Sequence, residues 1–239
     1  VINNGIFTSC KMNDNCPPWS IKAEKITHDK IKQDMIYKNA ILKIYDVPVL
    51  YFPKFFHPDP SVKRRSGFLQ PQFNNSETLG SSLYIPYFKT LGHDKDLTFK
   101  PTLFEKLKRF EREKYILQSE FRKQGKDSFL ITDFGMLRDY KRSSDNKYKN
   151  ANHLFLDYKS DLKIPNYLDS EFGAHIEKVT NDTYLKVFQN NLFDTHTLLK
   201  PGNLGTMNSN IKFYLEQEDQ NFTTGIEVYE NLGVKNSDR

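Results

Sequence analysis

Residues 46–73 constrain the fold of this chain more than any other part of the sequence. They read DVPVLYFPKFFHPDPSVKRRSGFLQPQF, with an apolar strand, a proline-rich bridge, a basic cluster and a second strand in one short stretch. Proline has a fixed φ and no backbone N–H, so we expect the prolines of residues 53–60 to prevent regular pairing and hold the chain extended. This stretch therefore predicts a boundary between two β units, joined by a stiff linker.

The apolar, proline and basic positions of this stretch form a recognisable pattern. The positions that carry it are Val47, Pro48, Val49, Tyr51, Pro53, Pro58, Arg64, Arg65, Ser66, Gly67, Phe68, Leu69 and Pro71, extended by Leu83, Pro86, Tyr87 and Phe88. The pattern resembles the junction in the LptD family of LPS-assembly outer-membrane proteins (also called OstA or Imp). In that family a periplasmic β-jellyroll leads into a transmembrane β-barrel.

The resemblance implies an all-β fold with three parts. Residues 1–57 would be the C-terminal part of the periplasmic jellyroll, residues 58–65 a linker, and residues 66–239 the N-terminal antiparallel strands of a large barrel, here incomplete. The sequence shows no signal peptide, and we expect it to be a fragment of a longer exported precursor.

Composition is compatible with this expectation. The sequence has no run of 18 or more apolar residues, which excludes transmembrane helices. A mean hydropathy of -0.68 does not exclude a membrane barrel, because barrel strands alternate lipid-facing with lumen-facing residues. The aromatic content of 14% is high, as aromatic girdles at the membrane interfaces require.

The basic balance does not indicate a nucleic-acid partner. The net charge is +5, but the 35 basic residues are interleaved with 30 acidic ones and form no stripe with stacking aromatics. We therefore expect no nucleic-acid binding.

Cys10 and Cys16 are the only cysteines, separated by the polar sequence KMNDN. In an oxidising periplasm they could close a small loop, or each could pair with a partner outside this sequence. In the LptD family, disulfides tie the periplasmic domain to the barrel. A metal site is the weaker interpretation, because two cysteines supply half a zinc site and no histidine lies nearby.

The first unit is expected to have one apolar concave face. Strand-like segments around residues 19–24 and 35–45 alternate apolar with polar side chains, followed by another strand over residues 47–52. Such a face could be only the core of a sandwich. The resemblance implies instead a groove for lipid acyl chains, since the family's jellyroll holds them. The candidate groove residues are Trp19, Ile21, Ala23, Leu42 and Ile44.

A basic cluster follows the prolines. Lys63, Arg64 and Arg65 could meet the phosphates of an anionic glycolipid, or serve as a plain anchor at the membrane interface.

Beyond Ser66 the pattern predicts nine strands, most of them close to the 9–11 residues that cross a bilayer when tilted. The connections alternate between compact ones, such as residues 124–126, and long ones, such as residues 181–205, which is typical of outer-membrane barrels. Nine is an odd number, so we expect an arc of a larger wall. The predicted strands are residues 66–74, 80–89, 95–104, 113–123, 127–138, 152–162, 170–180, 206–217 and 221–231.

Pro71 and Pro86 lie in the first two of these strands and should each remove one ladder hydrogen bond. The resemblance implies a lateral gate at these prolines, where the lipid leaves sideways through the seam between the first and last strands. The alternative is that they only bend the strand at a rim. Pro101 in the third strand shows that prolines recur without a gate.

The sequence contains no catalytic constellation. HExxH, P-loop, GxSxG and GxGxxG motifs are all absent, and the 6 histidines are dispersed. His175 and Glu177 share one face of a strand and are expected to form a solvated pair. We expect no enzyme activity, cofactor or metal.

The resemblance implies a translocon component that inserts lipopolysaccharide into the outer leaflet. The barrel would lie in the outer membrane among its lipids, and residues 1–57 would lie in the periplasm. The implied partners are a plug lipoprotein, LptE, and a periplasmic bridge protein, LptA. The alternatives are a general outer-membrane porin, or a soluble all-β carbohydrate-binding module.

Overall fold

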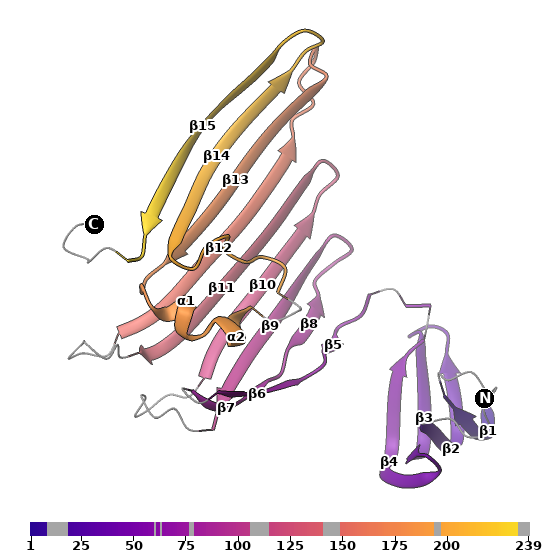
Figure 1. Ribbon diagram of the computed structural model, residues 1–239. Helices are drawn as coiled ribbons and strands as arrows, with labels where there is room; N and C mark the ends of the chain where they lie inside the picture. Colours follow the sequence, from indigo (N-terminus) through magenta and orange to yellow (C-terminus); the bar gives the residue numbers. More distant parts are fainter. Residues whose placement is uncertain are drawn as a thin grey trace. The chain divides into compact units, whose positions relative to one another are not determined.

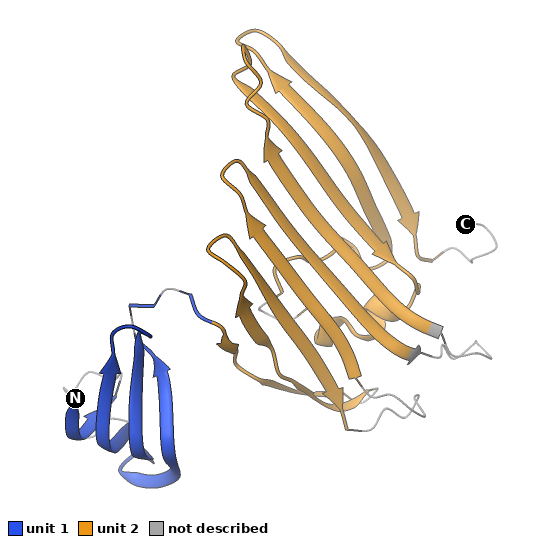
Figure 2. Cartoon of the chain, turned by 180° about the vertical axis from the view of Figure 1, so that it is seen from behind, with its two compact units in different colours: residues 1–65 blue, residues 66–239 orange. Residues whose placement is uncertain are grey.

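The computed structural model describes residues 1–8, 19–59, 61–62, 64–76, 79–105, 115–140, 149–193 and 197–233. The chain folds as two compact units, Val1–Arg65 (unit 1) and Ser66–Arg239 (unit 2), coloured separately in Figure 2. Strands pair antiparallel in both units, and the only described α-helices are two four-residue turns in unit 2. No described helix is long and apolar enough to cross a membrane. The predicted all-β antiparallel fold is confirmed.

Unit 1 is a four-stranded sheet whose strands pair in chain order (Figure 1). The strands are β1 (Ile2–Phe7), β2 (Trp19–Asp29), β3 (Asp34–Ile44) and β4 (Val47–Pro58). In the β2–β3 ladder Ile21 pairs with Leu42, and Ala23 pairs with Ala40. Apolar side chains of all four strands gather in one hydrophobic cluster. Its buried members are Ile21, Ala23, Ile26, Tyr37 and Ala40, with Phe7, Trp19, Met35, Leu42, Phe52 and Phe55 packed against them.

The alternation of unit 1 changes phase in the middle of the sheet. Strict alternation would place Ile26 on the face opposite to Ala23, yet both are buried in the same cluster. Asn4 in β1 (φ 50°) and Asn39 in β3 (φ 48°) have left-handed backbone, which asparagine adopts more readily than most residues. Both lie beside residues 24–25 of β2. The two asparagines are thus aligned across β1, β2 and β3. At this position the alternation shifts by one residue, so that the apolar side chains on both sides of it lie on the same face.

The prediction that prolines prevent pairing over residues 53–60 is wrong for its first part. β4 stays paired with β3 as far as Pro58, which lies opposite Asp34. β4 is an edge strand of the described sheet, where the missing N–H of a proline can point away from the ladder. Pro53 falls at a gap in the ladder, across from the left-handed Asn39.

Unit 2 is a single sheet in the order β15-β14-β13-β12-β11-β10-β9-β7-β6. β8 also pairs with β9, β5 pairs with β8, and the described strands do not close into a barrel. The strands are β5 (Gly67–Phe68), β6 (Gln72–Ser76), β7 (Gly80–Tyr84), β8 (Tyr87–Thr90), β9 (Lys95–Phe104), β10 (Tyr115–Gln124), β11 (Ser128–Tyr140), β12 (Lys149–Asp161), β13 (Asp169–Val179), β14 (Thr206–Glu216) and β15 (Asn221–Asn231).

The predicted strands of unit 2 are found with small shifts at their ends. The last seven predicted segments correspond to the single strands β9 to β15. The first two, residues 66–74 and 80–89, are each broken, into β5 and β6 and into β7 and β8. Short turns lie at one end of the sheet and longer connections at the other, as the sequence predicted (Figure 1).

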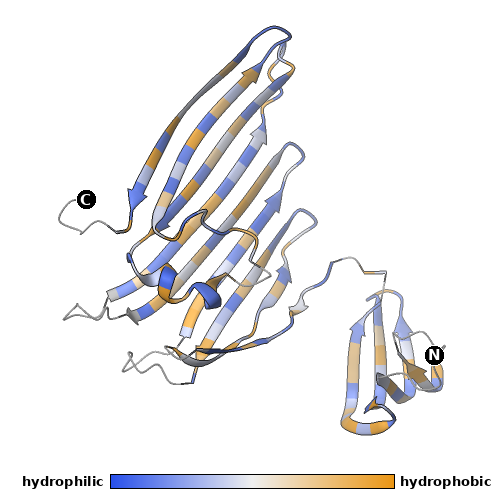
Figure 3. Ribbon diagram, in the orientation of Figure 1, coloured by the Kyte–Doolittle hydropathy of each residue, from blue (hydrophilic) through white to orange (hydrophobic). Residues whose placement is uncertain are grey.

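Apolar and polar residues alternate along many strands of unit 2 (Figure 3). The two faces of the sheet therefore differ in chemistry. In β9, Phe99 and Leu103 are 41% and 47% exposed, whereas Lys100 and Thr102 are 1% exposed. A sheet with one face in water normally buries its apolar face, so the sense is reversed here. We call the apolar side the outer face and the polar side the inner face. Outer-face residues at least 41% exposed include Phe99, Leu103, Phe134, Leu154, Ile211 and Ile226.

The chain between β13 and β14 folds back over the inner face (Figure 1). We call residues 180–205 the inward segment; its described part contains α1 (Tyr184–Val187) and α2 (Gln189–Leu192). Apolar side chains of these turns pack into the main core of unit 2. The inward segment thereby removes polar side chains of the inner face from water. The core pairs Tyr184, Leu185, Phe188 and Leu192 with strand residues that include Phe104, Ile116, Leu137 and Phe155.

Candidate functional site

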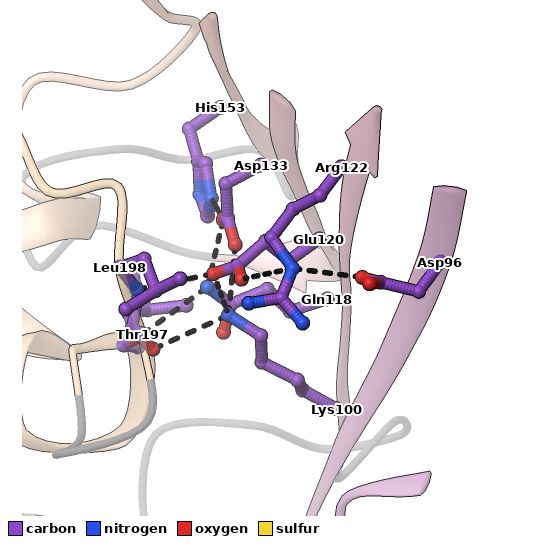
Figure 4. Close-up of polar contacts among 10 residues, drawn as sticks. Asp96, Lys100, Gln118, Glu120, Arg122, Asp133, His153, Thr197 and Leu198 are labelled. Carbon is purple, nitrogen blue, oxygen red and sulfur yellow. Dashed lines mark hydrogen bonds and ion pairs between the residues drawn. The ribbon is translucent and has the colours of Figure 1, made fainter. Parts of the chain in front are cut away.

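Lys100 of β9 is the centre of a buried charged network on the inner face (Figure 4). Its Nζ lies 2.9 Å from Glu120 Oε2, 2.9 Å from Asp133 Oδ2 and 3.3 Å from Thr197 Oγ1. Lys100, Glu120 and Asp133 are each 2% exposed or less. A charge so far from water is tolerated only when it is paired and hydrogen-bonded, so each member depends on the others.

The second carboxylate oxygen of Asp133 is also satisfied. Oδ1 accepts hydrogen bonds from Gln118 Nε2 and His153 Nε2, each at 2.8 Å. Gly135 lies opposite His153 in the ladder and makes room for its ring, because a Cβ at Gly135 would lie 2.2 Å from His153 Cε1. Lys100, Gln118, Gly135 and His153 form one row across β9 to β12. The pairing register of the strands therefore brings the residues of the network side by side.

The same network holds the inward segment on the sheet. The backbone N–H of Leu198 donates to Glu120 Oε2 at 3.2 Å, and Gln118 Nε2 donates to the carbonyl of Leu192 at 3.1 Å. Thr197 Oγ1, besides its contact with Lys100, donates to the Leu192 carbonyl at 3.1 Å. These contacts satisfy backbone groups that the covered loop would otherwise bury without partners.

The sequence interpretation missed this network. In the structure Asp96 Oδ1 accepts from Arg122 Nε at 2.7 Å, beside the Lys100 cluster. The signal was the row in which Lys100 and Gln118 align with a glycine, Gly135, opposite His153.

Two cavities adjoin each other on the inner face, further along the sheet. A cavity of about 590 Å³ is lined by residues that include His175, Glu177, Lys200 and Tyr229. A second, of about 380 Å³, shares His175 and extends over β12 to β14. Their walls mix carboxylate, ammonium, amide and aromatic groups, which can bind polar molecules with many hydroxyl groups.

The expectation of a solvated His175–Glu177 pair is wrong for Glu177. His175 Nε2 lies 3.3 Å from Glu177 Oε1, but the Glu177 side chain is only 3% exposed. Its carboxylate accepts the backbone N–H groups of Gly202 at 3.2 Å and Asn208 at 2.8 Å. Glu177 is therefore a structural acceptor that fixes the end of the inward segment, and His175 also contacts Asp157.

Pro71 and Pro86 lie in the two breaks of the first strands. The break between β5 and β6 covers residues 69–71, and the break between β7 and β8 covers residues 85–86. The register shifts by one residue across the first break, since Phe68 pairs with Tyr87 whereas Gln72 pairs with Tyr84. An extra residue on one strand is a β-bulge, so Pro71 sits at a bulge.

Pro101 belongs to the same weakened region, although the sequence interpretation treated it as unrelated. The N–H of Ile85 donates to the Pro101 carbonyl at 3.2 Å, and the N–H of Leu69 donates to the Pro86 carbonyl at 2.9 Å. In a regular antiparallel pair each residue would also receive a return bond. Neither proline has the N–H to make it. The pairs Leu69–Pro86 and Ile85–Pro101 are therefore each held by one hydrogen bond instead of two.

The candidate groove residues of unit 1 separate into two groups. Ile21 and Ala23 are buried in the apolar cluster, and Trp19 and Leu42 pack against it. Ile44 pairs with Trp19 across the ladder but is 45% exposed and lies outside the cluster.

Only part of the basic and cysteine candidates can be located. Lys63, Cys10 and Cys16 lie outside the described residues. Arg64 is exposed, whereas Arg65 forms an ion pair with Asp34, with Nη2 3.0 Å from Oδ2. The hydrogen bond and charge of Arg65 hold the pKa of the Asp34 carboxyl below its usual range.

Comparison with known proteins shows what the chain is similar to. It is 34% identical over 133 residues to the LPS-assembly protein LptD of Shewanella denitrificans, 56% of this chain and 17% of that protein. It is 30% identical over 185 residues to LptD of Francisella tularensis subsp. novicida, 75% of this chain and 21% of that protein. This chain is LptD-like. The LptD of Legionella pneumophila is 36% identical over 105 residues. No family model matches the chain.

The resemblance predicted from the sequence is therefore confirmed. The LptD-like chain spans about a fifth or less of the length of these curated relatives. This part contains a four-stranded unit and a second sheet with chemically different faces, in which the first two predicted strands are each broken.

Proposed function

We propose that this LptD-like chain is part of an outer-membrane translocon that inserts lipopolysaccharide into the outer leaflet. One observation carries the proposal, namely that the unit 2 sheet exposes an apolar outer face and covers an inner face on which charged residues are buried beside the core. This arrangement suits an arc of transmembrane β-barrel wall, with lipid outside and a polar lumen inside. The chain would act without enzyme chemistry, cofactor or metal.

Unit 1 would lie in the periplasm and offer its apolar cluster to the acyl chains of the lipid. The curled sheet and the side chains Trp19, Ile21, Ala23 and Leu42 support this role. Ile44, exposed at the end of the same row, would be the point where the chains leave the groove. Arg64, with Lys63, would meet the phosphates, and Arg65 would fix the linker through Asp34.

The lipid would leave sideways through the weakened first strands, while its sugars pass along the inner face. Each missing ladder bond at Pro71, Pro86 and Pro101 is worth about 0.5–1.5 kcal/mol in water. Lipid offers no replacement partner, so the loss weighs more there. The two inner-face cavities would give the sugars polar contacts along the way.

The proposed partners follow from the family resemblance. A plug lipoprotein, LptE, would occupy the lumen, and a periplasmic bridge protein, LptA, would deliver lipid to the jellyroll. A disulfide made by Cys10 or Cys16 would tie the periplasmic unit to the barrel. Alkylation of freshly isolated, unreduced envelopes tests the cysteines, since two reactive thiols would contradict the bond.

Controlled depletion of the full-length protein tests the function itself. We expect newly made lipopolysaccharide to stop reaching the cell surface, and re-expression to restore it. A general porin would instead change the uptake of small solutes while surface lipopolysaccharide stayed normal. That second result would overturn the proposal.

Replacing Pro71 and Pro86 together by alanine tests the gate. The restored N–H groups should let the first strands pair more fully, so lipid release should slow while assembly stays intact. If surface lipopolysaccharide and barrel abundance are both normal in the double variant, the prolines only shape the strand.

A photo-crosslinking amino acid placed at Leu42 or Trp19 tests the groove. It should capture lipopolysaccharide in living cells, whereas the same group at Lys22, on an exposed side chain of β2, should not. Leu42→Asp should block lipid passage and spare barrel insertion. Absence of captured lipid at both positions would exclude the groove.

A further inference from the structure

The inward segment reaches much further across the sheet than its attachment points require. It leaves β13 and returns to β14, which are neighbours in the sheet. Between these ends it contacts Glu120 and Gln118 of β10, then Lys100 of β9, and finally Ser82 of β7. Its contacts therefore reach from β13 and β14, near the β15 edge of the sheet, to the broken strands at the other edge.

The last contact is a buried side-chain hydrogen bond. Asn191 Nδ2 of α2 donates to Ser82 Oγ at 2.9 Å, and the two residues are 7% and 4% exposed. The Ser82 hydroxyl in turn points to the carbonyl of Asn74 in β6, at 3.5 Å. One chain of polar contacts thus links α2 to both strands of the β6–β7 hairpin.

Apolar contacts support the same link. Phe188, between α1 and α2, packs edge-on against Phe104 of β9 at 6.0 Å between ring centroids. Phe104 pairs with Ser82 in the β7–β9 ladder, and Leu79, just before β7, belongs to the same core as Phe188. The part of the hairpin around Leu79 and Ser82, near its turn, is therefore packed against the inward segment.

Among the described residues, the hairpin is attached to β9 by a short ladder. β7 pairs with β9 through Ser82, Leu83 and Tyr84, with one further bond from the Glu105 N–H to the Ser81 carbonyl at 2.9 Å. At the other end, the next position is the one-bond pair of Ile85 with Pro101. The β9–β10 ladder, by contrast, continues without a break from Lys95 to Leu103. A hairpin with so short a ladder owes a large share of its attachment to the contacts made by α2.

We propose that α1 and α2 form a strap that holds the β6–β7 hairpin against β9, with Asn191 as its positioning residue. The strap keeps the weakened first strands attached to β9 at rest, and they part from it only when α2 leaves the hairpin. This inference rests on the proposed function, because it assigns a control element to the same lipid exit.

A reversible cross-link tests the strap in the full-length protein. Ser82→Cys and Asn191→Cys together are joined by a short bifunctional methanethiosulfonate reagent in cells. We expect delivery of new lipopolysaccharide to the surface to fall to the level of depleted cells, and to recover when a reductant cleaves the link. The same double variant before treatment, and the parent chain treated identically, are the controls, and delivery should fall only in the double variant that has been cross-linked.

Normal delivery by protein shown to be cross-linked would overturn the strap while leaving the proposed function intact. The proposed function fails separately, if depletion of the parent protein leaves surface lipopolysaccharide unchanged.

A second measurement separates positioning from general stability. Spin labels at Asn75 in β6 and Lys123 in β10, both exposed, report the position of the hairpin. Asn191→Ala should broaden and lengthen this distance distribution, whereas Asn190→Ala, its exposed neighbour in α2, should leave it unchanged. Identical distributions in the two variants would contradict the role of Asn191.

Discussion

The two units of this chain use the same alternation of apolar and polar residues in opposite senses. In unit 1 the apolar set is buried, with Ala23 and Ala40 at 1% and 0% exposed. In unit 2 polar residues are buried on the inner face, with Lys100 and Asp133 at 1% and 0%, beside a hydrophobic core, while the apolar outer face is exposed. A two-residue period defines two faces but does not say which is covered. The covering element decides it, and in unit 2 that element is the inward segment.

This contrast implies that the exposed apolar residues of the two units meet different surroundings. In unit 2 they lie on one face of β9, β11, β12, β14 and β15, the outer face. A surface of that extent is not left in water. In unit 1 the exposed apolar residues are spread over strand ends, turns and the two edge strands, with Phe56 on the edge strand β4.

The largest expected effect comes from breaking the polar interior of unit 2. Lys100→Met leaves Glu120 and Asp133 as uncompensated buried charges, which should cost about 3–5 kcal/mol. We expect little folded protein to reach the membrane, measured as the heat-modifiable form on gels. Lys126→Met, in an exposed turn, is the matched control and should assemble normally.

A triple variant sharpens the result. Lys100→Met with Glu120→Gln and Asp133→Asn removes all three charges, so it should recover part of the assembly lost in the single variant. Equal assembly of Lys100→Met and Lys126→Met would show that the network is not needed.

The next effect compares the exposed apolar residues of the two units. Leu154→Arg on the outer face should cost about 2–4 kcal/mol if the residue lies near the bilayer midplane. Phe56→Arg in unit 1, at 60% exposed, should change stability by no more than about 0.5 kcal/mol. Urea titration of the full-length protein in lipid vesicles measures both. Similar small effects would remove the contrast between the units.

A smaller effect tests the packing beneath the network. Gly135→Ala would place a Cβ 2.2 Å from the His153 ring and should cost about 1–3 kcal/mol. Gly173→Ala in β13 is the control, because its nearest neighbour, the Tyr158 carbonyl oxygen, would lie 3.9 Å away. The same titration should place the Gly173 variant close to the parent protein. A parent-like Gly135→Ala would mean that His153 has another position available.

The smallest expected effect concerns the linker of unit 1. The hydrogen bond from Arg65 lowers the pKa of Asp34, so its contribution is complete above the ordinary carboxyl pKa. It is lost as the pH falls through the lowered value. Residues 61–65 should therefore stay attached from neutral into mildly acidic solution and be released only in strong acid, measured by pepsin cleavage. Asp34→Asn should show no such acid step, and a step in both proteins would contradict this account.

The sequence predicted much of the fold because its signals are local. Alternation located the strands β9 to β15, and Pro71 and Pro86 marked the breaks in the strands before them. Three features were missed because each depends on a partner distant in sequence. The pairing of β4 beyond Pro53 depends on an edge position, and the burial of Ile26 depends on Asn4 and Asn39 in neighbouring strands.

The third missed feature, the buried network, depends on the inward segment. Lys100 and Asp133 are polar residues at ordinary inner-face positions, and the described part of the inward segment contacts Lys100 through Thr197. The path of a long loop is set by tertiary packing, which periodicity in the strands does not encode. Sequence patterns therefore predicted the strands that carry the candidate site, but not the inward segment that covers it.

The most direct test of the contrast measures what touches the exposed apolar residues. Spin labels at Phe99, Phe134 and Leu154 on the outer face, and at Phe56 in unit 1, are compared in the full-length protein in lipid vesicles. Our account predicts that the three outer-face labels collide with oxygen and are shielded from a water-soluble nickel chelate, whereas the Phe56 label meets the chelate freely. Equal access of the chelate to all four positions would contradict a lipid-facing wall.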